Sequence, residues 1–149
     1  MLTVKHISGN DDWLQAAFRI REKVFVDEQH VPASEEYDEF ETIARHFLAF
    51  ADETPCGTAR WRHTGKGIKL ERFAVLSEFR GQKVGSALMQ AVLDDIGAQP
   101  GTAGRQRYLH AQLTAMPLYG KFGFRLVGEL FLECDIEHYK MILDEPVAY

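Results

Sequence analysis

The stretch with the clearest chemical potential runs from a β-type segment, Leu70–Leu76, through a tight turn into Arg80-Gly81-Gln82-Lys83-Val84-Gly85-Ser86. A strand that turns directly into a helix leaves backbone N–H groups without intrahelical partners, and the helix dipole adds partial positive charge to that end. Such a junction can bind a phosphate with little help from side chains. This stretch is therefore a candidate anion-binding site.

The segment after the turn has the spacing of an amphipathic helix. Its apolar positions form one stripe, at Val84, Ala87, Leu88, Ala91, Val92 and Ile96. The chain contains neither G-x-x-x-x-G-K-[ST] nor G-x-G-x-x-G, so a P-loop nucleotidase and a dinucleotide-dependent oxidoreductase both lack their signature. The anion is expected to be a different phosphate.

The elements around this junction predict a mixed, mostly antiparallel sheet. Strands are expected over residues 2–7, 45–51, 56–63, 68–76, 108–112, 124–130 and 136–143, and helices over 12–28, 84–96 and 114–122, the last one capped by Thr114. The three strands between 45 and 76 should form an antiparallel meander. The strand at 108–112 should return parallel to Leu70–Val75 through a right-handed crossover.

An acidic stretch lies between the first helix and the meander. From Asp27 to Glu41, seven of fifteen residues are acidic and none is Lys or Arg. Two interpretations stay open, a solvated loop with a short acidic helix, or an acidic rim that attracts a cationic amine or polyamine through its field.

Composition sets the class. The 149 residues are 46% hydrophobic and 26% charged, as in a single globular domain, expected over 1–149. No apolar run approaches the roughly 20 residues that span a bilayer, and the first residues lack a signal-peptide core. A soluble, cytoplasmic protein without a membrane partner is expected.

The net charge and the cysteine content disfavour some ligands and some kinds of site. The formal net charge of −5 disfavours a nucleic-acid binder that works by neutralising phosphates. Cys56 and Cys134 are far apart and outside any CxxC pair, so two buried, reduced thiols are expected, with no metal site.

In the phosphate-binding turn described above and in a segment further along the chain, the sequence resembles the GNAT superfamily of N-acetyltransferases. Arg80–Ala87 is similar to the family's R/Q-x-x-G-x-G/A pyrophosphate motif, and Tyr119-Gly120-Lys121-Phe122-Gly123-Phe124 is similar to its Y-x-x-x-G-F segment. Arg21–Gln29 and Phe131–Met141 resemble the bacterial ElaA/YjcF-like branch. The resemblance covers essentially the whole chain and implies an α/β fold with a splayed sheet of about six to seven strands flanked by about four helices.

The resemblance also implies acetyl-CoA, or coenzyme A, as co-substrate. Its pyrophosphate would lie on the N–H groups of Gln82–Ser86, and its pantetheine would lie along Phe73–Val75 by strand addition. The implied binding residues are Phe73, Ala74, Val75, Arg80, Gly81, Gln82, Lys83, Val84, Gly85, Ser86 and Gln112. Lys83 occupies the position of the usual first glycine of the motif. A side chain is tolerated there if φ stays negative, since the N–H then still points at the phosphate, and the ammonium could help to bind it.

Acetyl transfer to an amine requires a base and an acid. A lysine-like amine is neutral in only about one molecule in 10³ at pH 7, and the departing thiolate benefits from a proton donor. The resemblance assigns the acid to Tyr119. Glu71 is a candidate base, and simple alternation places it on the face of Phe73 and Val75 unless a bulge intervenes. The alternative is an ion pair of Glu71 with Arg60 or Arg62.

His138 and Glu133 are rival bases from the last strands, although a strand histidine is more often a hydrogen-bonded structural residue. No Cys or Ser stands beside an evident base, which favours direct transfer in a ternary complex over an acetyl-enzyme.

The sequence thus predicts an N-acetyltransferase that moves an acetyl group from acetyl-CoA to a primary amine of a small molecule or peptide. A non-catalytic acyl-CoA-binding sensor is the alternative, and an acyl-transferring synthase is a third possibility with little room in a chain of this length. The oligomeric state, monomer or homodimer, stays open, because Leu130-Phe131-Leu132 could pair between subunits at a sheet edge.

Overall fold

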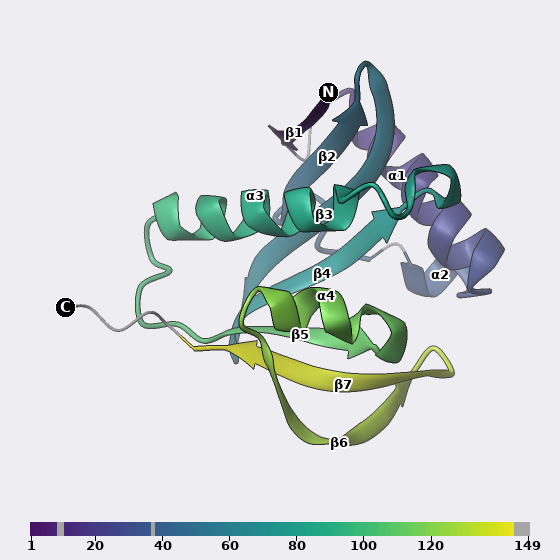
Figure 1. The fold of residues 1–149 in the computed structure, drawn as a ribbon. Helices are drawn as coiled ribbons and strands as arrows, with labels where there is room; N and C mark the ends of the chain where they lie inside the picture. Colours follow the sequence, from purple (N-terminus) through teal and green to yellow (C-terminus); the bar gives the residue numbers. More distant parts are fainter. Residues whose placement is uncertain (9–10, 37, 145–149) are drawn as a thin grey trace.

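The computed structural model describes residues 1–8, 11–36 and 38–144, which form one sheet with helices on both faces (Figure 1). The strands are β1 (Leu2–Ile7), β2 (Arg45–Ala51), β3 (Thr54–Thr64), β4 (Gly67–Val75), β5 (Arg107–Gln112), β6 (Arg125–Glu133) and β7 (Ile136–Leu143). The helices are α1 (Leu14–Arg21), the π-helix η1 (Glu22–Glu28), α2 (Ala33–Glu36), the 3₁₀ turns η2 (Ser77–Phe79) and η3 (Leu113–Ala115), α3 (Val84–Ala98) and α4 (Met116–Lys121).

The strand order is β1-β2-β3-β4-β5-β7-β6, and every neighbouring pair is antiparallel except β4–β5. Short turns join β2, β3 and β4 into the expected meander. The crossover through α3 makes β5 parallel to β4, because a strand-helix-strand unit returns in the same direction. The predicted mixed, mostly antiparallel seven-stranded sheet is confirmed.

The sheet is splayed in its middle. β4 and β5 pair only at Ile68↔Arg107 and Lys69↔Tyr108, although β4 continues for six residues beyond the second pair. Figure 1 shows α4 lying over the region where the two strands separate. The carboxyl-terminal half of β4 is therefore not hydrogen-bonded to β5.

A bulge in β4 changes which side chains share a face. The β3–β4 register shifts between Thr58 and Arg60, and Arg72 has a left-handed φ of 59°. As a result Leu70 and Phe73, three positions apart, both pack in the core under α3, and Glu71, next to Leu70, lies on the opposite face of the strand. Simple alternation, which placed Glu71 on the face of Phe73, is therefore wrong here, and the bulge alternative is confirmed.

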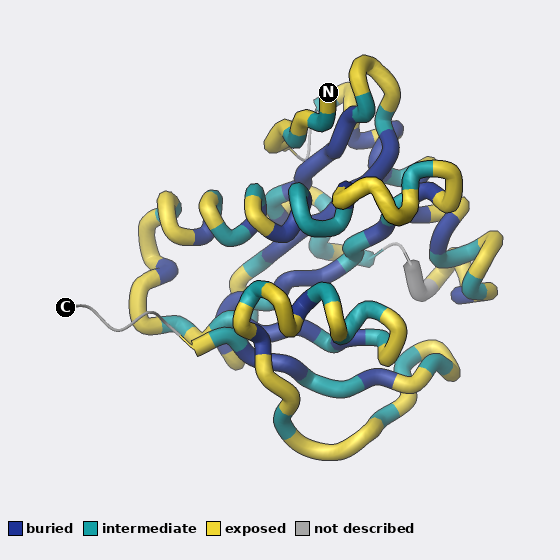
Figure 2. The backbone as a smooth tube through the Cα atoms, viewed as in Figure 1, coloured by how far each residue is buried: buried dark blue, intermediate teal, exposed yellow. Residues whose placement is uncertain are grey.

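Each face of the sheet carries its own core. Phe47 and Ala49 of β2 face α3, while Leu48 and Phe50 of the same strand face α1, as the two-residue period of a strand requires. Figure 2 shows the buried positions concentrated along the strands and the sheet-facing sides of the helices. Both layers are thus anchored on the central strands.

Three local expectations are corrected. The helix expected over 12–28 is an α-helix only to Arg21 and continues as a π-helix, a form that often occurs at functional sites. Thr114 does not cap the following helix, because α4 begins at Met116 with Ala115 at its N-cap position. Cys56 is buried as expected, but Cys134 is exposed, since it lies in the turn between β6 and β7.

The edge strand β6 carries three exposed leucines, Leu126, Leu130 and Leu132. Its register against β7 shifts between Val127 and Phe131, and Gly128 has a φ of 77°, so a bulge bends this edge. Pairing between subunits along β6 stays a prediction.

Gly57 gives a test of the packing between β3 and α3. A Cβ there would lie 2.8 Å from a Val84 methyl and 3.1 Å from a Leu88 methyl, so Gly57→Ala should lower the free energy of unfolding by about 1–3 kcal/mol. Gly97→Ala is the matched control, because its Cβ meets nothing within 4 Å and should stabilise α3 by about 0.5–1 kcal/mol. Urea denaturation measures both, and an equal effect of the two substitutions would contradict the close approach.

Candidate acyl-transfer site

The separation of β4 and β5 opens a pocket of about 560 Å³. Its walls come from both splayed strands, η1, the first turn of α3, α4 and the β6–β7 turn. Of the predicted site residues, it is lined by Glu71, Phe73, Ala74, Val75, Arg80, Gly85, Gln112, Tyr119 and His138. Gly81, Gln82, Lys83, Val84 and Ser86 lie next to the lining residues Arg80 and Gly85 without lining the pocket themselves.

The loop before α3 has a geometry that the sequence did not predict. Lys83 has a φ of 68°, in the left-handed region, and Gly81 has a φ of 79°. The condition of a negative φ at Lys83 is therefore not met. The turn from η2 into α3 requires a left-handed residue, which glycine adopts freely and a lysine adopts at a cost of about 1–2 kcal/mol, and this explains why glycine is usual there.

The start of α3 remains open to a ligand. Lys83, at the N-cap position, makes no side-chain capping bond within the described chain. The N–H groups of Val84, Gly85 and Ser86 therefore lack helical partners. Arg80 holds the loop in place by donating to the Val75 carbonyl at 3.1 Å and pairing with Glu28 of η1 at 2.9 Å.

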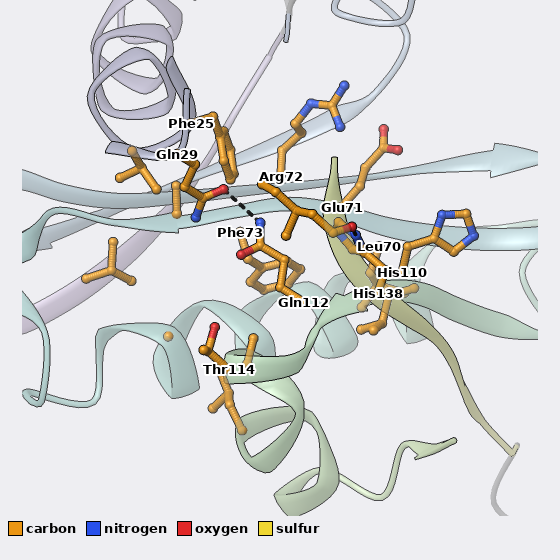
Figure 3. Close-up of a pocket in the computed structure, with 18 of the residues that line it drawn as sticks. Phe25, Gln29, Leu70, Glu71, Arg72, Phe73, His110, Gln112, Thr114 and His138 are labelled. Atoms are coloured by element: carbon orange, nitrogen blue, oxygen red, sulfur yellow. Dashed lines mark hydrogen bonds between the residues drawn. The ribbon is translucent and has the colours of Figure 1, made fainter. Parts of the chain in front are cut away.

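A bridge between two amides crosses the middle of the pocket. Nε2 of Gln112 on β5 donates to Oε1 of Gln29, just after η1, over 2.8 Å (Figure 3). Gly85 approaches α4 closely, since a Cβ there would lie 3.0 Å from a Leu118 methyl. Gln112 was predicted from the sequence but Gln29 was not, because no local pattern connects residues so distant in the chain.

Tyr119 lies in an apolar part of the wall. Its ring packs edge-on against Phe73 at 6.0 Å and Phe124 at 6.3 Å between centroids. Burial raises the pKa of Tyr119 to about 12. The phenol therefore keeps its proton across the physiological range and remains a proton donor.

Glu71 is held by cations. Its carboxylate accepts hydrogen bonds from Nε of Arg60 at 2.6 Å and Nε of Arg62 at 2.9 Å, with Lys69 at 3.5 Å. Burial raises the pKa of Glu71, but these cations outweigh it and leave the pKa below its usual value. The ion-pair alternative for Glu71 is confirmed.

The acidic stretch contributes to the same network. Arg21 and Arg60 are each only 1% exposed. Glu41 accepts from Arg21 at 2.9 Å and from Arg60 at 2.7 Å, and Asp38 accepts from Arg60 at 2.9 Å and Arg72 at 3.2 Å. These two carboxylates thus pair with partly or fully buried arginines, so neither a purely solvated loop nor a substrate-attracting rim describes them.

Glu71, His110 and His138 gather on the side of the pocket opposite the Gln29–Gln112 bridge (Figure 3). Nδ1 of His138 lies 2.7 Å from the Ile136 carbonyl, to which it donates, and the ring is buried and stacked on Phe131. His110, which the sequence analysis missed, lies 3.0 Å from Glu133. Its alternation with Gln112 on β5 was the signal available for it.

No cluster of ligands that could hold a metal ion occurs among the described residues. No helix in the described ranges is long and apolar enough to cross a membrane.

A sheet opened between two parallel strands, with an uncapped helix start at the opening and a buried phenol on the wall, is the architecture of the GNAT acyltransferases. The model of the acetyltransferase (GNAT) domain matches residues 10–145. The chain belongs to the GNAT acetyltransferase family.

Its relatives place it in the ElaA/YjcF-like branch. The chain is 42% identical over 139 residues to the uncharacterized N-acetyltransferase YjcF of Bacillus subtilis (strain 168), which covers 93% of this chain and 97% of that protein. Escherichia coli ElaA has a similar structure, with a TM-score of 0.85 and 26% identity over 97% of this chain and 100% of that one. An acyl-CoA N-acyltransferase from Pseudomonas aeruginosa matches with a TM-score of 0.84 and 28% identity over the same shares.

The carboxylates of the arginine network should make the fold sensitive to acid. Burial raises the pKa of Asp38, but Arg60 and Arg72 bring it down to about 2, below the unfolded value of about 3.9. The unfolded chain therefore takes up protons first, and the free energy of unfolding should fall as the pH drops from about 4 toward 2. Urea denaturation at a series of pH values measures this slope.

Asp38→Asn should flatten that slope, because the titrating group is gone. Asp94→Asn, on the exposed face of α3, is the control and should leave the slope unchanged. Equal slopes for the native protein and Asp38→Asn would contradict a role of this ion pair in acid stability.

Proposed function

We propose that the protein transfers an acetyl group from acetyl-CoA to a primary amine by direct attack within a ternary complex. The observation that carries this is the pocket, which reaches from the open start of α3 along the half of β4 that β5 does not pair, with Tyr119 on its wall. This path has the order of chemical groups in an acyl-CoA, with phosphate first, then amides, then thioester.

The described residues fit such a co-substrate. The N–H groups at the start of α3 would hold the pyrophosphate, where the helix dipole favours negative charge. The carboxyl-terminal half of β4, which β5 does not pair, would accept the pantetheine amides as an added strand. Gln112 and Arg80 line the two flanks, and Lys83 would add an ammonium near the phosphates.

Tyr119 is the proposed general acid. A phenol whose pKa is raised to about 12 by burial stays protonated until a thiolate forms beside it, and it can then donate that proton. Glu71, His138 and Glu133 are the candidate bases named from the sequence. Glu71 is paired with three cations, which disfavours its taking up a proton.

Direct transfer needs no protein nucleophile. Burial raises the pKa of the Cys56 thiol, which makes it a poor nucleophile. Cys134 lines the pocket and lies in the exposed β6–β7 turn. The ternary-complex route is proposed over an acetyl-enzyme because the sequence places no Cys or Ser beside an evident base.

A thermal-shift screen with acetyl-CoA, longer acyl-CoAs, NAD and ATP tests the ligand class. Acetyl-CoA at about 100 times its dissociation constant should stabilise the fold by about 2.7 kcal/mol, and NAD should have no effect. Stabilisation by ATP or NAD but not by any CoA species would overturn the proposal. Stabilisation by acetyl-CoA without thiol release across a panel of spermidine, lysine and glycinamide would favour the sensor alternative.

Tyr119→Phe should lower kcat by about 10²- to 10⁴-fold while acetyl-CoA binding stays nearly intact, because only the proton donor is lost. Thiol release and thermal shift measure the two effects separately. Tyr108→Phe is the matched control, since it also removes a phenol, one that contacts Thr64 at 2.6 Å and does not line the pocket. A loss of only a few-fold in Tyr119→Phe would remove this residue from the mechanism.

A further inference from the structure

A histidine and a carboxylate from different strands meet at the end of the pocket opposite the Gln29–Gln112 bridge. Nδ1 of His110 on β5 lies 3.0 Å from Oε2 of Glu133, the last residue of β6. Both residues line the pocket, and their side chains are 29% and 41% exposed. The pair is thus accessible from the pocket and from water.

The surroundings hold the imidazole in one orientation. The His110 ring packs edge-on against Phe131 at 5.1 Å and tilted against Tyr108 at 6.0 Å. The hydrogen bond from His110 is the main cause that lowers the pKa of Glu133 to about 2. Glu133 therefore stays ionised as the partner of His110.

We propose that His110 is the general base that accepts the proton of the acceptor amine, and that Glu133 positions it. This inference rests on the proposed acetyl transfer. If Nδ1–H donates to Glu133, the other ring nitrogen, Nε2, carries the lone pair and can accept a proton. The ionised carboxylate then stabilises the imidazolium that forms, as in carboxylate–histidine dyads generally.

The atoms balance in this scheme. Nε2 of His110 takes the proton from the ammonium, and the neutral amine attacks the thioester carbonyl. The new N–C bond forms and the C–S bond breaks, and Tyr119 protonates the leaving thiolate. The nitrogen gives up its second proton through water to the Tyr119 phenolate, which restores the phenol and leaves the neutral amide, and His110 passes its proton to water. No other co-reactant is required.

The rival bases are less suited. Glu71 is bound by Arg60, Arg62 and Lys69, which oppose its protonation. His138 is only 7% exposed and donates to the Ile136 carbonyl; a neutral carbonyl stabilises an imidazolium less than a carboxylate does. Of these three described residues, only His110 combines a carboxylate partner with access to water.

Other charged groups also surround His110. A second, smaller depression beside His110 is lined by Glu129 of β6 and Lys140 of β7. Lys140 is the cross-strand partner of His110. Lys69 and Glu71 of β4 and His138 of β7 line the main pocket with it. A pH dependence must therefore be read from variants of His110 itself.

The test is the pH dependence of kcat/KM in His110→Gln, with the panel amine that gives the fastest thiol release. At pH 7 we expect a loss of about 10²- to 10⁴-fold. The loss should shrink as the pH approaches the pKa of a lysine-like amine, about 10.4, because solvent then deprotonates the acceptor. The Tyr119→Phe defect should not shrink in this way. His63→Gln, a histidine that contacts Arg105 and does not line the pocket, should behave as the native protein.

Glu133→Gln tests the positioning role and serves if His110→Gln fails to fold. It should lower kcat/KM by a smaller factor and change the ¹⁵N signature of the His110 tautomer, which a merely structural role would not move.

The outcomes separate the two proposals. If the native protein turns over an amine and His110→Gln does so at the same rate at pH 7, the role of His110 is overturned and the acetyl transfer stands. A defect of His110→Gln that stays constant up to pH 10 has the same meaning. Binding of acetyl-CoA without turnover of any amine by the native protein overturns both.

Discussion

The separation of β4 from β5 is the constraint on which the site depends. The two strands share only the pairs Ile68↔Arg107 and Lys69↔Tyr108, so the rest of β4 turns peptide groups toward a pocket instead of toward another strand. Unpaired backbone groups are costly when they are buried, and an extended ligand that carries amides can satisfy them. The left-handed Arg72 and the bulge opposite β3 keep β4 paired with β3 while it leaves β5. The opening is therefore built into the backbone.

The arginine network stabilises the wall beside this opening. Arg21 and Arg60 are almost completely buried, and a buried charge that loses its partner costs about 3–5 kcal/mol. Asp38, Glu41 and Glu71 supply those partners, so the segment before β2, the helix α1 and two strands are tied to one another. The same contacts hold Glu71 in its ionised form. A carboxylate that the sequence suggested as a base thus contributes to structure.

Local patterns predicted most of the fold and part of the site. The seven strands, the parallel return of β5 and the amphipathic α3 follow from periodicity and turn residues, which act over a few positions. The face of Phe73 and the left-handed Lys83 did not follow, because a bulge and a loop geometry depend on the neighbouring strand and helix. The partners of Asp38 and Glu41, the exposure of Cys134 and the His110–Glu133 pair were also missed. Each of these depends on contacts between residues far apart in the chain.

The pKa values of two ionisable groups of the site, Tyr119 and Glu133, lie far apart. Burial keeps the Tyr119 phenol protonated up to about pH 12, and the contact with His110 keeps Glu133 ionised down to about pH 2. Neither residue changes its charge in the range where imidazoles and amines titrate. The Tyr119 phenol, the Glu133 carboxylate and the cations around Glu71 therefore keep the same charges across that range. The imidazoles and an acceptor amine are therefore the groups whose ordinary pKa values lie between those two limits, and in the proposed reaction the Tyr119 proton moves only when a thiolate forms beside it.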